Sequence, residues 1–233
     1  VAGAVLVRLE DDEARAALAQ AEAARQQALA RRDSQREVQR CAGDWLFYQR
    51  RGAKEDQFKL CTRQGLAGAE RVLFDPEELK KKSGKPHAIN WYSASPDGAK
   101  VALGVSAGGS EEASMRVLDV KSGRQLGPII DRTRFGGISW SRDGRQIYFH
   151  RMQALKKGAP PTDKYQRSMA CVMPAGGRER SIRVLLRAGD KGPIQVPATE
   201  FPFIEIMPDG RAIASAMDGV SSASGCCCGP VTK

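Results

Sequence analysis

Three segments of the chain share one pattern of hydrophobic and polar positions. In each, a short run that alternates apolar and polar residues reaches an Asp-Gly pair, and a second apolar run follows after one or two polar residues. Asp-Gly favours the positive φ angles of two-residue turns, and alternation with a period of two is typical of strands, so each segment predicts a β-hairpin. The segments span residues 91–104, 137–150 and 203–214. Because such a recurrence indicates a repeat architecture, we expect the four-stranded blades of a β-propeller.

Other period-two runs supply further strands between and before these hairpins. We expect them at residues 45–51, 57–63, 71–74, 115–126 (a hairpin turned at 121–123), 167–173 and 182–186. The blade that begins at Phe203 is left with two strands, because residues 221–230 show neither strand nor helix periodicity. The pattern therefore predicts about two complete blades and parts of two more, which is fewer than a propeller needs to close.

Two helical segments are also expected. Residues 11–36 are rich in Ala, Glu, Gln and Arg and contain no Gly or Pro, which favours an N-terminal α-helix. Its apolar stripe is mostly Ala, so we expect it to pack against a flat surface rather than to form a coiled coil. Asp75 followed by Pro76 is typical of a capped helical turn.

Composition narrows the class of protein. The 233 residues are 41% hydrophobic, enough for a packed core, and the formal charge of +10 is spread among 27 acidic residues with only small basic clusters at 80–85 and 178–187. No aromatic-studded platform accompanies these clusters, so we expect solvated loops and no nucleic-acid partner. No apolar run reaches the roughly 20 residues that a membrane-spanning helix needs, so no membrane partner is expected.

The cysteines and histidines give no metal-binding pattern. The cysteines are Cys41, Cys61 and Cys171, each isolated, and the adjacent Cys226, Cys227 and Cys228. None forms the paired arrangement of a zinc site, and the two histidines lie far apart in sequence. We therefore expect no metal and no cofactor, and interpret the three isolated cysteines as small buried hydrophobes. The role of the adjacent three stays open.

The run Gly104-Val105-Ser106-Ala107-Gly108 matches the G-x-S-x-G pattern of a hydrolase nucleophile elbow. An elbow needs a strand-to-helix turn within alternating strands and helices, whereas residues 113–120 here predict another antiparallel strand. The only later histidine, His150, alternates with Tyr148 inside a predicted strand. We expect Ser106 to lie in a Gly-rich loop between strands, and we assign no catalytic residue.

Several short runs identify a family by their order. They are residues 57–60, 68–76, 84–90, 93–98, 108–111, 117–120, 134–140 and 162–168. Taken in this order, residues 9–220 resemble the N-terminal β-propeller region of the prolyl oligopeptidase family of serine peptidases. The resemblance implies a mainly β fold: an incomplete propeller, about three to four blades of a seven-bladed type, preceded by an N-terminal α-helix. It divides the chain into a helical segment at 1–40 that would pack on a catalytic domain, a partial propeller at 41–220, and an irregular Ser- and Cys-rich tail at 221–233.

The resemblance also implies a function. In this family the propeller caps an α/β-hydrolase domain that cleaves peptides after proline, and it restricts access to short, unfolded substrates. The catalytic Ser, Asp and His lie in the hydrolase domain, and this chain ends before that domain would begin. We therefore expect a substrate-gating part of a serine-type endopeptidase, inactive alone, whose partners are a peptide substrate and the missing catalytic domain. Departures from the family near residues 170–177 and after Val220 point to a truncated product, and we expect a cytoplasmic location, with a periplasmic or secreted one as the alternative.

Two aromatic residues are the candidate substrate-binding residues. In the resembling family an aromatic side chain just before the Trp-containing strand reaches the substrate pocket, and Phe135 matches that position; Phe201 matches a second residue at the pocket edge. The alternative for both is packing within the blades. Trp91 and Trp140 are expected to fill the space between neighbouring blades.

A different class of function stays open beside this one. A stand-alone, propeller-like binding scaffold could complete its ring by oligomerisation, because the unpaired edges of an open blade favour association. A nucleic-acid-binding β protein, the third hypothesis, predicts affinity that falls steeply with salt.

Overall fold

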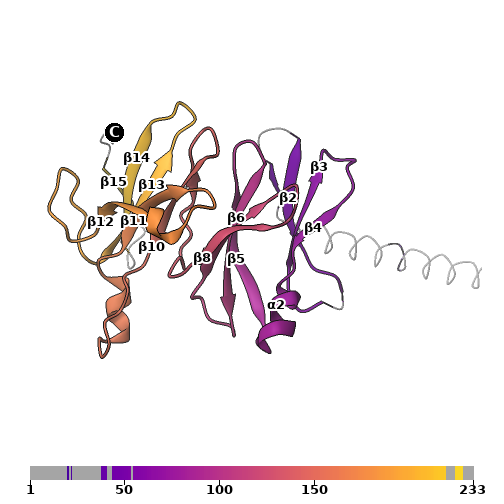
Figure 1. The fold of residues 1–233 in the computed structure, drawn as a ribbon, viewed down its shortest axis with the longest axis horizontal. Coiled ribbons are helices and arrows are strands. Elements are labelled where there is room, and N and C mark those ends of the chain that lie inside the picture. The colour runs from indigo at the N-terminus through magenta and orange to yellow at the C-terminus, as the bar shows by residue number, and fades with distance from the viewer. Residues whose placement is uncertain are drawn as a thin grey trace, which may run out of the picture.

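The computed structural model describes residues 20, 22, 38–40, 44–53, 55–218 and 224–227. These residues form four antiparallel sheets that lie side by side in chain order, from indigo to yellow in Figure 1. Neighbouring strands in each sheet follow one another along the chain, which is the meander topology of propeller blades. The expected mainly β, partial-propeller fold is confirmed.

The first sheet contains β1 (Val38–Arg40), β2 (Trp45–Arg50), β3 (Lys59–Gln64) and β4 (Arg71–Phe74). The second contains β5 (His87–Ala94), β6 (Lys100–Ala107), β7 (Ser114–Asp119) and β8 (Gln125–Ile130). The third contains β9 (Ser139–Trp140), β10 (Gln146–Arg151), β11 (Met169–Pro174) and β12 (Arg183–Arg187). The fourth contains β13 (Glu200–Ile206), β14 (Ala212–Asp218) and β15 (Ser224–Cys227).

The structure holds more of the propeller than the sequence pattern predicted. Strand β1 completes the first sheet and begins at Val38, ahead of the boundary expected at residue 41. Strand β15 pairs with β14 across residues expected to be irregular, so that expectation is wrong for Ser224–Cys227. Both are edge strands, whose pairing depends on a neighbour rather than on their own alternation. Gln20 and Glu22 are helical, and the rest of the expected helix at 11–36 lies outside the described residues.

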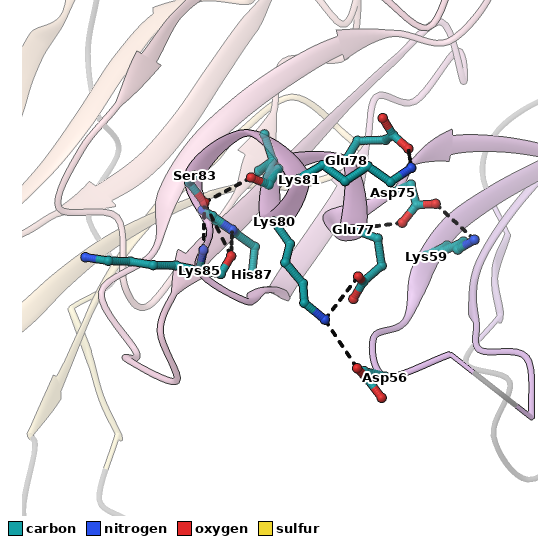
Figure 2. A network of polar contacts seen from close by, with 11 residues as sticks. Asp56, Lys59, Asp75, Glu77, Glu78, Lys80, Lys81, Ser83, Lys85 and His87 are labelled. Carbon is teal, nitrogen blue, oxygen red and sulfur yellow. Dashed lines mark hydrogen bonds and ion pairs between the residues drawn. The ribbon is translucent and has the colours of Figure 1, made fainter.

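Helix α2 (Pro76–Ser83) joins the first two sheets and confirms the expected capped turn. Asp75 accepts a hydrogen bond from the Glu77 backbone at 2.9 Å, and Gly84 ends the helix in the left-handed conformation. Figure 2 shows that the same Asp75 carboxylate is ion-paired with Lys59 of β3 at 2.9 Å, which fastens the start of the helix to the first sheet. No helix in the part of the chain that the structure describes is long and apolar enough to cross a membrane.

The Asp-Gly hairpins are confirmed, but their turns are of another type than expected. In the first, the Gly98 amide donates to the Ser95 carbonyl at 2.8 Å, so Pro96 and Asp97 are the central residues of the turn. Gly98 is the one residue of this turn with a positive φ, of 68°. The Asp97 side chain accepts a hydrogen bond from the Ala99 amide at 3.0 Å. The Asp side chain therefore stabilises a longer loop than the two-residue turn that the dipeptide predicted.

The hydrophobic cores lie between the sheets. One core joins the first sheet to the second and includes Phe47, Leu60, Leu73, Val101, Leu103, Val105, Leu118 and Val120. The next joins the second sheet to the third and includes Ala102, Met115, Val117, Ile130, Trp140, Ile147, Phe149, Met169, Cys171 and Met173. Strand β6 contributes alternate residues to both, because a strand in the middle of a blade has a packed neighbour on each face.

The tryptophans pack between blades as expected. The indole of Trp91 lies so close to Gly104 that a Cβ added there would come within 2.2 Å of the ring, and its Nε1 donates to the Thr133 carbonyl at 3.1 Å. Trp140 is 7% exposed and donates to Ser93 at 3.2 Å. Large rings thus fill the space where glycine leaves room.

Candidate functional site

The candidate site is built on a turn between the second and third sheets. The backbone amide and the hydroxyl of Thr133 both donate to the Ala113 carbonyl, at 3.0 and 3.1 Å, which anchors the turn to the second sheet. The Gly136 amide donates to the Thr133 carbonyl at 3.1 Å and closes the turn. Arg134 and Phe135 are therefore its two central residues, held by backbone contacts that do not involve their side chains.

Two consecutive glycines bring this turn against aromatic rings of neighbouring blades. Gly136 and Gly137 have φ angles of 64° and 57°, which residues other than glycine rarely adopt. An added Cβ would come within 3.0 Å of Trp91 at Gly136 and within 2.3 Å of Phe203 at Gly137. The Gly-Gly pair thus serves both the backbone conformation and the close approach.

The structure brings the two predicted aromatic residues together. The ring centroids of Phe135 and Phe201 lie 4.8 Å apart, although the residues come from different blades. Phe135 is half-buried, whereas Phe201 is 5% exposed. Phe201 therefore lies beneath Phe135, and the exposed part of the pair belongs to Phe135.

His150 of β10 is the member of this cluster that the sequence did not indicate. Its ring centroid lies 5.6 Å from Phe135, 5.6 Å from Phe201 and 5.0 Å from Phe203. The residue is fully buried, and neither ring nitrogen has a hydrogen-bond partner in the described part of the chain. Burial lowers the pKa of His150 to about 4, so the ring is neutral near pH 7. Alternation within β10 shows which face a residue takes, but no local signal shows that three phenylalanines from elsewhere will enclose it.

Arg134 joins Phe135 to two further connections of the propeller. Its Nη1 donates to the Tyr165 hydroxyl at 2.8 Å, and the guanidinium carbon lies 5.5 Å from the centre of the Phe135 ring. It also forms an ion pair with Glu111. Beside it, Lys164 is paired with Glu112 at 2.5 Å. Arg134 thus connects the aromatic cluster to a group of charged side chains from neighbouring connections.

The other candidates from the sequence lie away from any reactive arrangement. Ser106 is inside strand β6, paired with Ala88 and 4% exposed, so the expectation of a loop there is wrong. The continuous apolar run of a central strand explains the difference. Cys61 and Cys171 are buried, and burial raises the pKa of Cys171 to about 11. Cys41 lies outside the described residues. Within the described ranges, no cluster of three or more His, Cys, Asp and Glu side chains could hold a metal ion.

A hollow lies on the first sheet, lined by none of the residues of the aromatic cluster. It is an open depression of about 600 Å³ lined by Trp45, Thr62, Gln64, Gly68, Ala69, Glu70 and Arg71. Its Glu70 carboxylate is engaged by the Tyr48 hydroxyl and by Arg50, so its main acid has structural partners.

Comparison with known proteins identifies related sequences. Residues 8–174 match the family model described as "Prolyl oligopeptidase, N-terminal beta-propeller domain". The chain is 27% identical over 154 residues to a prolyl endopeptidase of Elizabethkingia meningoseptica, covering 65% of this chain and 21% of that protein. It is 31% identical over 100 residues to an uncharacterized peptidase of Sinorhizobium fredii, covering 41% of this chain and 13% of the relative. The matches thus span about a fifth or less of the curated relatives.

Solved structures show the same fold. The alignment with a solved prolyl endopeptidase structure covers 81% of this chain and 25% of the other chain, with a TM-score of 0.64 and 20% sequence identity. Prolyl oligopeptidase B from Galerina marginata, bound to a 35mer hydrolysis and macrocyclization substrate, covers 81% of this chain and 28% of its own, with a TM-score of 0.65 and 15% identity.

Proposed function

Because this chain belongs to the prolyl oligopeptidase family and covers its N-terminal β-propeller region, we propose that it is the substrate-gating part of a serine-type endopeptidase that acts on short peptides. The α/β-hydrolase catalytic domain is not covered by this chain, and the proposal assigns peptide hydrolysis to that domain. The contribution of this chain is to limit which peptides reach it and to supply one edge of the substrate pocket.

The main support for a role in substrate binding is the contact between the Phe135 and Phe201 rings. Phe201 and His150 both contact the Phe135 ring, which stays partly exposed. A rigid, partly exposed aromatic face suits an apolar side chain or a proline ring of a peptide. We assign direct contact with the peptide to Phe135 and support of that ring to Phe201.

A cytoplasmic location belongs to the same proposal, with a periplasmic or secreted one as the alternative. Its support is that Cys61 and Cys171 are free and buried rather than joined in a disulfide.

The test is a chimera in which this chain replaces the matching segment of the Elizabethkingia meningoseptica prolyl endopeptidase. We expect it to cleave a short peptide after proline and to spare the same sequence inside a folded protein. Phe135→Ala should raise KM for the short peptide about tenfold while lowering the melting temperature much less than loss of a core ring does. The matched control is Phe149→Ala, which removes the same ring from the core and should cost about 3–5 kcal/mol of stability.

Two outcomes count against the proposal. If Phe135→Ala destabilises the protein as Phe149→Ala does and leaves KM unchanged, the ring is core packing and not a pocket residue. If the chain alone sediments as a uniform assembly of defined size and the chimera does not cleave the peptide, the scaffold alternative is favoured instead.

A further inference from the structure

We propose that Arg134 is a positioning residue that both fixes the Phe135 ring and tethers the connection between β10 and β11 to the rim of the propeller, and thereby sets how large a peptide can pass. The part of this inference that concerns peptides rests on the proposed function. The tether itself is a property of this chain and can be tested without any catalytic domain.

The first step is the position of the guanidinium between two rings. The Arg134 guanidinium carbon lies 5.5 Å from the centre of Phe135 and 5.6 Å from the centre of Tyr165, within the range of cation–π attraction. Its Nη1 also donates to the Tyr165 hydroxyl at 2.8 Å. A planar cation can stack on rings and donate in its plane at the same time, which an ammonium group cannot do. The Phe135 ring therefore contacts both the buried Phe201 ring and the Arg134 guanidinium.

The second step is that three separate connections meet at this arginine. Residues 108–113 follow β6, residues 131–138 follow β8, and residues 152–168 follow β10. Arg134 is paired with Glu111 of the first connection and bonded to Tyr165 of the third. Lys164 adds a parallel link, since it is paired with Glu112 at 2.5 Å and lies 5.0 Å from the centre of the Tyr165 ring. Through Arg134, the turn between the second and third sheets thus links a connection of the second sheet to a connection of the third sheet.

The third step is that the connection at 152–168 is anchored at both ends and exposed in between. At its start the Met152 amide donates to the Arg132 carbonyl at 2.8 Å, and at its end the Arg167 amide donates to the Ala198 carbonyl at 2.7 Å. Residues 154–158 between them are exposed. The connection also contains one short 3-10 helix, η1 (Pro161–Tyr165), which ends at the tyrosine that Arg134 contacts. Loss of the Arg134 contacts should therefore loosen the connection while the backbone hydrogen bonds at its two ends remain.

The fourth step is that the contacts of Arg134 differ in their exposure to solvent and therefore to salt. The Arg134 side chain is 23% exposed, whereas that of Glu111 is 70% exposed. The stacking and the Tyr165 hydrogen bond are thus partly shielded from solvent, whereas the ion pair with Glu111 is open to screening by salt. High salt should weaken the tether, and loss of Arg134 should remove it.

The experiment measures trypsin cleavage of the full chain after Lys156 and Lys157, both exposed in the connection. Arg134→Gln should accelerate this cleavage about tenfold, and Tyr165→Phe, which removes only the hydroxyl, about threefold, because cleavage reports local opening. Arg145→Gln is the matched control: it removes the same charge from an 84% exposed side chain paired only with its neighbour Asp143, and should change nothing. Added salt should accelerate cleavage of the unchanged chain more than of Arg134→Gln.

The tether is refuted if Arg134→Gln and Arg145→Gln are cleaved at the same rate as the unchanged chain. If Arg134→Gln does not fold, Tyr165→Phe decides the question alone, since it keeps every ring and charge in place. In the chimera, Arg134→Gln should raise kcat/KM for long peptides relative to short ones. If proteolysis responds to Arg134 while Phe135→Ala has no effect on substrates, the tether holds and the proposed function fails.

Discussion

Acid should weaken this propeller through one buried histidine. His150 is fully buried among Phe135, Phe201 and Phe203, with no partner for either ring nitrogen among the described residues. Burial is the cause that lowers the pKa of His150, because the buried ring cannot be hydrated when it is charged. Protonation of His150 in the folded chain would bury an unpaired charge.

The magnitude follows from the two pKa values. Burial lowers the pKa of His150 to about 4, whereas an exposed histidine in the unfolded chain has a pKa of about 6.5. The unfolded state therefore binds the proton first as the pH falls, so stability is lost progressively from about pH 6.5 downward until both states are protonated near pH 4. Linkage gives a loss of about 2 kcal/mol between pH 7 and pH 5, and about 3 kcal/mol in all.

The assay is urea unfolding at pH 7 and pH 5 for the unchanged chain and for His150→Phe. The phenylalanine variant removes the titrating group and keeps an aromatic ring in an aromatic cluster, so its stability should change little between the two pH values. The other histidine, His87, is present in both proteins and cancels in the comparison. Equal losses of stability in the two proteins would refute the reasoning, as would an NMR titration of the His150 ring near pH 6.5.

Two further substitutions test the packing within one blade and the contact between two blades. Gly104→Ala should lower stability by about 1–3 kcal/mol, because its methyl group would meet the Trp91 indole, whereas Gly192→Ala, where no atom lies closer than 3.9 Å, should have little effect in the same thermal melt. Arg71→Met should lower the midpoint of urea unfolding without changing the dependence of the unfolding free energy on urea concentration. The substitution removes the hydrogen bond of 2.7 Å that Arg71 of the first sheet donates to the Lys121 carbonyl beside the second sheet. A loss of stability well under about 0.5 kcal/mol would show that this contact does not hold the two sheets together.

Features that depend on neighbouring residues in the chain could be predicted from the sequence. The Asp-Gly pairs and the period of two located the hairpins, and Asp75 with Pro76 located helix α2, because turn geometry and capping are local preferences. The family resemblance made Phe135 and Phe201 the candidate substrate-binding residues, and their role stays a prediction. The same local rules were less reliable where a neighbour decides: Ser224–Cys227 became a strand through pairing with β14, and Ser106 became part of β6.

The candidate site was decided by the tertiary structure. His150 carries no signal of its own in β10, yet packing of β13 against β10 places it between Phe201 and Phe203 and leaves its nitrogens unpaired. Arg134 and Tyr165 likewise come from separate connections that meet only when the blades stack. The sequence by itself determined the central hairpins of the blades, since a strand pattern and a turn need only adjacent residues. The arrangement around Phe135 required the fold, since burial and charge pairing arise between residues that the sequence keeps apart.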